Sequence, residues 1–260
     1  MSQSRSMSLA GVVLAACAVP GASAPGAVVV SSDRPSFSDG TGLAPAGHAI
    51  LETGITVGRD ERPGARTDRL AVPETLLRAP LLERVEARVG YGGMLWRDGQ
   101  GASESGSADA TLGIKALVQP ETDDLPAIAL GLTTSLGQGD EDFGAGNADP
   151  VARLIWSRTL GAGFGLGGNF VVACPGGSSG RFTQSAVSLY GTWSPVVGAT
   201  FFAEVFAVEP AAEGGDTAFA CDAGLLQLLS TRVQFDARVG FGLDRDAEDH
   251  TAGVGLTFLF

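Results

Sequence analysis

The last ten residues, Thr251 to Phe260 (TAGVGLTFLF), constrain the fold more than any other stretch of the chain. Two sets of residues alternate along it: the large apolar ones are Val254, Leu256, Phe258 and Phe260, and the small or polar ones are Gly253, Gly255 and Thr257. Leu259 alone breaks this alternation, which has the period of a β-strand. The ends of soluble proteins usually fray, whereas the closing strand of a membrane barrel stays paired to its end. The stretch therefore favours a membrane barrel, with an edge strand of a soluble sandwich as the alternative.

Composition narrows the class of protein further. No apolar run of 18 or more residues occurs outside the amino terminus, which excludes membrane-spanning helices. The 38 glycines disfavour helices and suit a crowded barrel interior. A net charge of -12 argues against nucleic acid, because its phosphates would be repelled. We therefore expect an all-β protein with no nucleic-acid partner.

The amino terminus has the pattern of an export signal over residues 1–24. Arg5 provides the positive charge, an apolar run follows, and Ala22-Ser23-Ala24 forms a small-residue cleavage site. An alternative is the lipoprotein-like box that ends in Cys17, which would be lipidated. Both predict an exported protein, and residues 25–49 are then predicted to be an irregular leader on the periplasmic side.

Two further cysteines, Cys174 and Cys221, would lie in an oxidising compartment after export. Cys221 lies on the predicted strand 217–228 and Cys174 directly follows the predicted strand 163–173, and because these strands are not neighbours we predict no disulfide. Cys221 lies on the apolar parity of its strand, where it would act as a small hydrophobic residue.

Strands of about ten residues recur from Ile50 onward, near the length that a tilted membrane strand needs. Twelve are predicted: 50–59, 66–79, 84–96, 107–118, 126–136, 149–159, 163–173, 182–193, 198–208, 217–228, 232–243 and 251–260. Short connections alternate with mostly longer polar ones, such as 97–106 and 137–148, as in outer-membrane barrels. We therefore predict a single antiparallel transmembrane β-barrel over residues 50–260, with a strand count within about two of twelve.

The inward parity of these strands carries many charges, which are the predicted lumen-lining residues. They are Glu52, Glu74, Arg78, Glu86, Arg88, Asp109, Lys115, Asp149, Arg153, Glu204, Asp222, Asp236 and Arg238. The favoured interpretation is an ion-pair network that fills the lumen, and the alternative is a polar path that selects permeants. The first candidates for a path are Glu74, Arg78, Glu86 and Arg88. About twelve strands lie between filled and open barrels, which predicts a constricted pore or a small cavity.

Aromatic residues cluster at one predicted level of the barrel. If the chain starts and ends in the periplasm, six rings share the periplasmic interface and form a girdle: Trp156, Phe164, Trp193, Phe201, Phe235 and Phe260.

Several stretches together resemble a known group of proteins. They are DRPSFSDG (33–40), ETGITVGRD (52–60), LAVPETLLRAPLLERVEARVGY (70–91), ADATLGIKALV (108–118), ADPVARLIWSR (148–158) and AEVF (203–206), with the terminal strand. Over residues 33–260 the chain resembles the phenol-degradation meta-pathway transporter family of bacterial outer-membrane barrels. The resemblance implies passage of aromatic compounds and brings no catalytic motif with it.

The predicted function is an outer-membrane channel or transporter for small molecules, aromatic or hydrophobic ones among them. The alternatives are a structural or adhesive barrel without a permeant, and a membrane-embedded lipid hydrolase. A hydrolase is disfavoured because His48 and His250, the two histidines, fall at opposite ends of the predicted barrel. No cofactor or metal site is predicted. The expected partners are outer-membrane lipid and the barrel assembly machinery, which would engage the strand that ends at Phe260.

Overall fold

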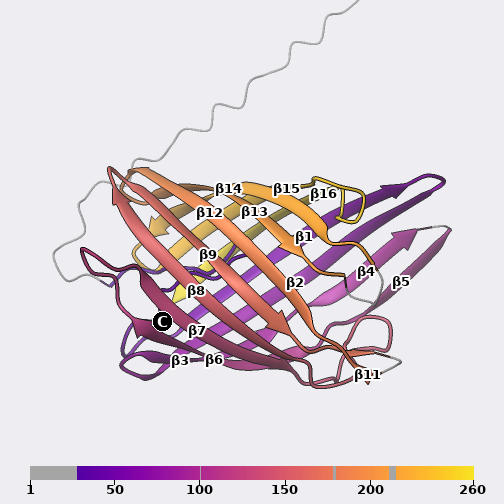
Figure 1. Ribbon diagram of the computed structural model, residues 1–260, viewed down its shortest axis with the longest axis horizontal. Coiled ribbons are helices and arrows are strands. Elements are labelled where there is room, and N and C mark those ends of the chain that lie inside the picture. The colour runs from indigo at the N-terminus through magenta and orange to yellow at the C-terminus, as the bar shows by residue number, and fades with distance from the viewer. Residues whose placement is uncertain (1–27, 100, 178–179, 211–214) are drawn as a thin grey trace, which may run out of the picture.

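Twelve long antiparallel strands close on themselves in the computed structural model, which describes residues 28–260 apart from 100, 178–179 and 211–214 (Figure 1). The barrel strands are β1 (Ile50–Arg62), β2 (Ala65–Leu82), β3 (Val85–Tyr91), β6 (Ala110–Gln119), β7 (Ala127–Ser135), β8 (Pro150–Gly161), β9 (Phe164–Ala173), β12 (Gln184–Val196), β13 (Ala199–Val208), β14 (Ala218–Ser230), β15 (Val233–Gly242) and β16 (His250–Leu259). Closure comes from β1, which pairs with β2 on one side and β16 on the other. The predicted barrel is confirmed, whereas the export signal and Cys17 lie outside the described residues. No helix in the described ranges is long and apolar enough to cross a membrane.

The strand predicted over 84–96 is wrong, because it is interrupted at Gly92-Gly93. Gly93 has a φ of +89°, and a side chain there would lie 2.8 Å from the carbonyl oxygen of Pro73. Beyond this break, β4 (Met94–Gly99) continues along β2, and β5 (Ala102–Ser107) pairs with β4. Residues 97–106 were predicted to be a polar loop, but most of them belong to the hairpin of β4 and β5. This hairpin extends from the barrel in Figure 1.

Short turns gather at one end of the barrel and long connections at the other, largely as predicted. The short-turn end holds the links between β8 and β9 and between β12 and β13, which are two residues each. The long-loop end holds residues 136–149 and 243–249, and the small hairpin of β10 (Gly176–Gly177) and β11 (Gly180–Arg181). The link between β1 and β2 is an exception, since those strands run on to a tight turn at Pro63-Gly64.

The predicted inward and outward faces are confirmed. On β6, Leu112 and Ile114 are exposed on the outside, whereas Lys115 is fully buried inside. On β13, Phe201 and Val205 face outward, and Glu204 is buried. The alternation of apolar and polar residues along the strands therefore corresponds to an apolar exterior of the barrel and a polar lumen.

Leu259, the residue that breaks the pattern of the last strand, faces inward and is 4 % exposed. It packs with Ile50, Val30 and Ala44 in a small apolar cluster, which Leu228 also contacts. The cluster lies inside the lumen at the short-turn end, so an apolar residue on the inward face is stabilising at this position.

The predicted girdle residues lie on outward parity near the short-turn end. The ring centroids of Phe164 and Trp193 are 6.1 Å apart, and those of Trp193 and Phe201 are 6.0 Å apart. Trp156 lies across from Gly168, and Phe235 lies across from Leu256. Phe260 is largely exposed. The role of these rings at a membrane interface stays a prediction.

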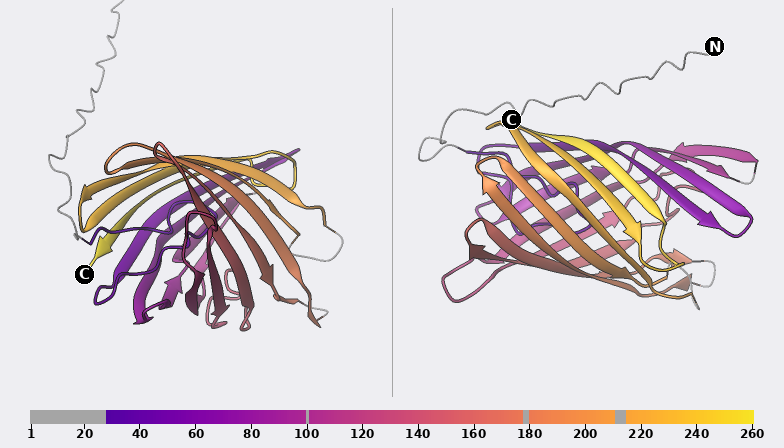
Figure 2. Two further views of the ribbon diagram at one scale, coloured as in Figure 1. Left: turned by 60° about the vertical axis from the view of Figure 1, so that its left-hand side comes forward. Right: turned by 90° about the horizontal axis from the view of Figure 1, so that it is seen from above.

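The leader enters the barrel instead of remaining outside it. The Val30 amide donates to the Thr231 carbonyl at the short-turn end, and the chain then runs through the lumen until it joins β1 at Ile50. Figure 2 shows this indigo segment inside the wall of strands. Sequence reasoning did not anticipate it, and we refer to residues 30–44 as the lumenal segment.

Candidate functional site

Asp33 of the lumenal segment lies at the centre of a buried ion cluster. Its Oδ2 is 2.7 Å from Arg88 Nη1 and 2.9 Å from Lys115 Nζ. Arg78 Nη1 lies 3.5 Å from the same oxygen. These cations come from β2, β3 and β6, which are neighbours in the sheet, so the register of the barrel creates the cluster.

Two acids of the barrel wall complete the charge balance. Glu86 Oε1 lies 3.0 Å from Arg78 Nε, and Glu52 Oε1 lies 3.0 Å from Arg78 Nη1. Arg78 also donates to the carbonyl oxygens of Ser31 (3.2 Å) and Gly42 (2.7 Å), which are backbone groups of the lumenal segment. Buried charges remain stable only when paired and hydrogen-bonded, and these side chains meet both conditions.

The charge of Asp33 follows from its neighbours. Burial by itself would raise the pKa of Asp33, but the positive charges of Arg78, Lys115 and Arg88 outweigh burial and hold that pKa well below its usual range. The carboxylate is therefore ionised at neutral pH and stays paired with these three cations.

A second attachment holds the far turn of the segment against β13 and β12. The Phe37 and Ser38 amides donate to Glu204 at 2.9 and 3.1 Å, and the Ser38 hydroxyl contacts Glu204 and Ser188. The Phe37 ring stacks on Phe206 with centroids 4.4 Å apart. The segment therefore crosses the lumen from one wall to the other.

Arg34 makes a third attachment toward β1, β2 and β15. Its Nη1 lies 3.2 Å from Glu74, and its Nε lies 3.6 Å from Asp236. Gly54 and Gly255 provide the space for the Arg34 guanidinium group, since a side chain at either position would overlap it. These inward glycines therefore accommodate a side chain of the segment.

The structure places the predicted lumen-lining residues in three groups. Those that are buried in the wall are Glu52, Arg78, Glu86, Arg88, Lys115, Glu204, Asp222 and Asp236. Those that are partly exposed to the lumen and form ion pairs there are Glu74, Arg153 and Arg238, with partners Arg34, Asp39 and Asp222. Asp109 and Asp149 instead hold the long connections, because they accept hydrogen bonds from the Gly139, Ala145 and Gly176 amides.

Sequence reasoning missed the partners that the lumenal segment contributes, namely Asp33, Arg34, Ser38 and Asp39. A signal was available, because charged residues and serines alternate densely in DRPSFSDG (33–40). An irregular stretch shows no periodicity, however, so nothing local says that its polar groups are buried.

Space remains in the lumen beside the lumenal segment, whose Asp33 and Arg34 are among the residues that line it. A cavity of about 340 Å³ lies between the lumenal segment and the wall formed by β12 to β15. Its lining combines hydroxyl and amide groups, including Tyr190 and Gln234, with apolar side chains such as Phe202 and Leu226.

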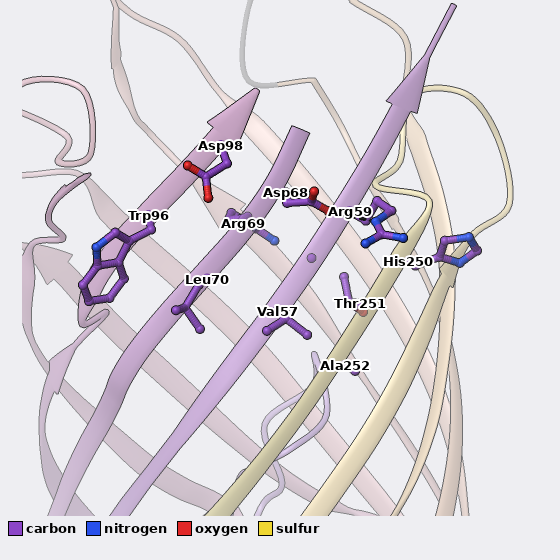
Figure 3. A pocket seen from close by; sticks show the side chains of 11 residues that line it. Val57, Arg59, Asp68, Arg69, Leu70, Trp96, Asp98, His250, Thr251 and Ala252 are labelled. Carbon is purple, nitrogen blue, oxygen red and sulfur yellow. Dashed lines mark hydrogen bonds and ion pairs between the residues drawn. The ribbon is translucent and has the colours of Figure 1, made fainter. Parts of the chain in front are cut away.

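A larger groove of about 730 Å³ lies on the outer face at the long-loop end (Figure 3). Val57, Leu70 and Trp96 form one level of it, and the charged pair Arg59 and Asp68 lies above them. Arg59 Nε is 2.8 Å from Asp68 Oδ1, so the two charges neutralise each other. Val57, Leu70 and Trp96 lie on outward parity, whereas Arg69 and Thr251, which also line the groove, lie on inward parity.

Comparisons with known proteins agree with this geometry. The model of the family described as "Putative MetA-pathway of phenol degradation" matches residues 32–260. The search of curated proteins found no match. Among solved structures, an outer membrane channel from Pseudomonas putida F1 is 12% identical with a TM-score of 0.65, covering 85% of this chain and 98% of that one. The β domain of the Bordetella autotransporter BrkA is 12% identical with a TM-score of 0.57, covering 82% and 99%. The NanC porin is 11% identical with a TM-score of 0.52, covering 81% and 98%. These likenesses show a shared barrel fold.

Proposed function

Since this chain belongs to the family described as "Putative MetA-pathway of phenol degradation", we propose that it is an outer-membrane channel for small molecules, aromatic or hydrophobic ones among them. The closed barrel has an apolar exterior and a polar lumen, which is the arrangement that spans a bilayer with strands. Residues 1–24 would direct export, and the paired strand that ends at Phe260 would be engaged by the barrel assembly machinery.

The observation that carries this proposal is the lumenal segment inside the barrel. A twelve-stranded barrel is wider than one that its own side chains fill, and here residues 30–44 occupy part of that width. The space that remains beside the segment includes a cavity of about 340 Å³, which is lined by polar groups together with a few apolar ones. Such a lumen supports passage of small solutes and opposes the wide, unselective flow of a large porin.

The ion cluster takes a structural role within this function. Arg78, Arg88 and Glu86 were first candidates for a permeant path, but they are buried and paired with the lumenal segment or with each other. A permeant that used them would have to separate buried ion pairs, which is costly. We assign these residues to the attachment of the segment, in line with the ion-pair network favoured from sequence.

A catalytic role finds no support in the arrangement of the histidines. His48 precedes β1 at the short-turn end, whereas His250 begins β16 at the long-loop end. About 30 Å of hydrocarbon would separate the two levels. A hydrolase that relied on either histidine would therefore have to work without the other.

Uptake into proteoliposomes tests the proposal. Vesicles that contain the purified protein should take up benzenesulfonate or a monosaccharide, which cross lipid slowly by themselves, faster than protein-free vesicles, and should exclude large oligosaccharides. Planar-bilayer recordings should show small conductance steps. Uptake equal to that of protein-free vesicles would contradict a channel, and large unselective conductance would contradict the constriction.

A further inference from the structure

The groove on the outer face at the long-loop end is built from two rows of register partners (Figure 3). The apolar row crosses β4, β2, β1 and β16, and its members are Trp96, Leu70, Val57 and Ala252. The polar row crosses the same strands two residues closer to the long-loop end, and its members are Asp98, Asp68, Arg59 and His250. Outward side chains therefore change from apolar to polar at one level on four neighbouring strands.

This change of level is the boundary that a bilayer interface imposes on a barrel. Outward side chains meet hydrocarbon on the apolar side of the boundary and lipid headgroups on the polar side. The two rows are about 7 Å apart along the strands, and the groove of about 730 Å³ is lined by both of them. An occupant that fills the groove therefore has an apolar chain and a polar head, as a lipid of that leaflet has.

The polar row places two acids next to each other. Asp98 lies directly opposite Asp68, and like charges in such a cross-strand pair are destabilising. Asp68 is compensated, because Arg59 Nε lies 2.8 Å and Arg66 Nη2 lies 2.7 Å from its carboxylate oxygens. Asp98 is exposed, and its side chain forms no ion pair or hydrogen bond among the described residues. The acid at the β4 end of the row therefore lacks a counter-charge, which a bound cation would supply.

The arginines on the other side of Asp68 keep donors for an anion. A guanidinium group has five N–H donors. Arg59 gives its Nε to Asp68, and Arg66 gives its Nε and Nη2 to the same carboxylate, so N–H groups of both arginines remain for another acceptor. Glu61 lies across from Arg66 but is not among the residues that line the groove. Donors for an anion and an acid that lacks a cation thus lie beside the same apolar row.

From these two rows we propose that the groove binds a lipid whose head carries both a phosphate and an ammonium group, as phosphoethanolamine does. The phosphate accepts from the remaining N–H groups of Arg59 and Arg66, and the ammonium group pairs with Asp98. The acyl chain lies along the apolar row. This inference goes beyond the channel function, because it concerns the outer face of the barrel and does not depend on what passes through the lumen.

Other headgroups match the polar row less well. A phosphoglycerol head has no ammonium group, so it leaves Asp98 without a counter-charge and brings a second negative charge close to it. A phosphocholine head has a quaternary ammonium group without N–H, so it offers Asp98 a charge but no hydrogen bond, and hydrogen bonds between charged groups are the stronger ones. The row therefore favours phosphoethanolamine over both.

Quenching of Trp96 fluorescence by brominated lipids tests the site. Replacement of Trp156 and Trp193 by Phe leaves Trp96 as the only one of the three tryptophans. The mature protein is reconstituted in phosphatidylcholine vesicles that contain the same small fraction of brominated phosphatidylethanolamine, phosphatidylglycerol or phosphatidylcholine. The ethanolamine lipid should quench about twofold more than the other two, which is the size expected of one exposed ion pair. Equal quenching by all three lipids, or no quenching by any of them, would overturn the site.

The Asp98→Asn variant locates the interaction. It should lose the preference for the ethanolamine lipid, whereas Glu104→Gln, on the inward face of the neighbouring strand β5, should keep it. A preference that persists in folded Asp98→Asn protein would overturn the pairing of the ammonium group with Asp98. Solute uptake into vesicles is a separate measurement, so equal quenching together with uptake would overturn the lipid site alone, and selective quenching without uptake would overturn the channel alone.

Discussion

Lys115 of β6 and Asp33 of the lumenal segment meet with Nζ and Oδ2 2.9 Å apart, although 82 residues separate them in the chain. Lys115 is fully buried, and Arg88 shares the same carboxylate oxygen. Because charges hidden from water need partners, the inward cations of the wall and the acid of the segment stabilise each other. This contact is one of the three attachments that hold the segment within the barrel.

Replacement of Asp33 by Asn should release the lumenal segment. The change leaves three buried cations without their shared carboxylate, and breaking a buried ion pair costs about 3–5 kcal/mol. We expect a larger single-channel conductance in planar bilayers, because residues 30–44 would occupy the lumen for less of the time. Asp123→Asn, in the exposed turn between β6 and β7, is the matched control and should conduct like the wild type. An unchanged conductance in Asp33→Asn would contradict attachment through this group.

The attachment of the lumenal segment through Asp33 should be insensitive to mild acid. A carboxyl whose pKa is lowered in the folded state contributes stability above its unfolded pKa, and loses it only as the pH falls through the folded pKa. The pKa of Asp33 is held well below the usual 3.8 by Arg78, Lys115 and Arg88, which outweigh the opposing effect of burial. A single cysteine at Ser32, next to Asp33, should therefore react equally slowly with a maleimide at pH 7 and pH 5.5 after correction for thiol ionisation. Faster corrected labelling at pH 5.5 would show that another group controls the attachment.

Truncation of Leu259 to Ala should destabilise the short-turn end of the barrel. The side chain is buried with Ile50, Val30 and Ala44, and removing a buried leucine side chain typically costs about 2–5 kcal/mol. Leu256→Ala, on the outward face of the same strand, should cost less because that side chain is 36 % exposed. Urea unfolding in lipid vesicles, followed by heat-modifiable gel migration, would compare them. Equal midpoints would refute a special role for the inward leucine.

A charge on the outward face should disturb the barrel according to its depth. Leu130 lies within β7 and is exposed on the outside, so Leu130→Arg would place a charge in hydrocarbon at a cost of about 2–4 kcal/mol. Leu160, beside the short turn after β8, is the comparison, where Leu160→Arg should cost about 0–1 kcal/mol. The folded fraction after insertion into vesicles gives the ranking. The reverse order would place the membrane at a different level of the barrel.

The sequence by itself determined the closed barrel, most of its strands and their two faces. These features follow from a period of two residues, because alternate residues of a strand lie on opposite faces of the sheet. The residues of a single strand therefore show which face is apolar. On β6, Leu112 and Ile114 lie on the outward face and Lys115 lies on the inward face. The inward charges were also visible, because charge on the outward face would be unfavourable.

Only the tertiary structure decided what these charges contact and what occupies the lumen. The lumenal segment has no periodicity, and its position depends on Asp33 meeting cations from three strands that become neighbours only when the barrel closes. The inward turn of Leu259 and the break at Gly93 likewise depend on contacts with distant residues. Local alternation carries no information about such long-range contacts, which is why the wall could be predicted from sequence and its contents could not.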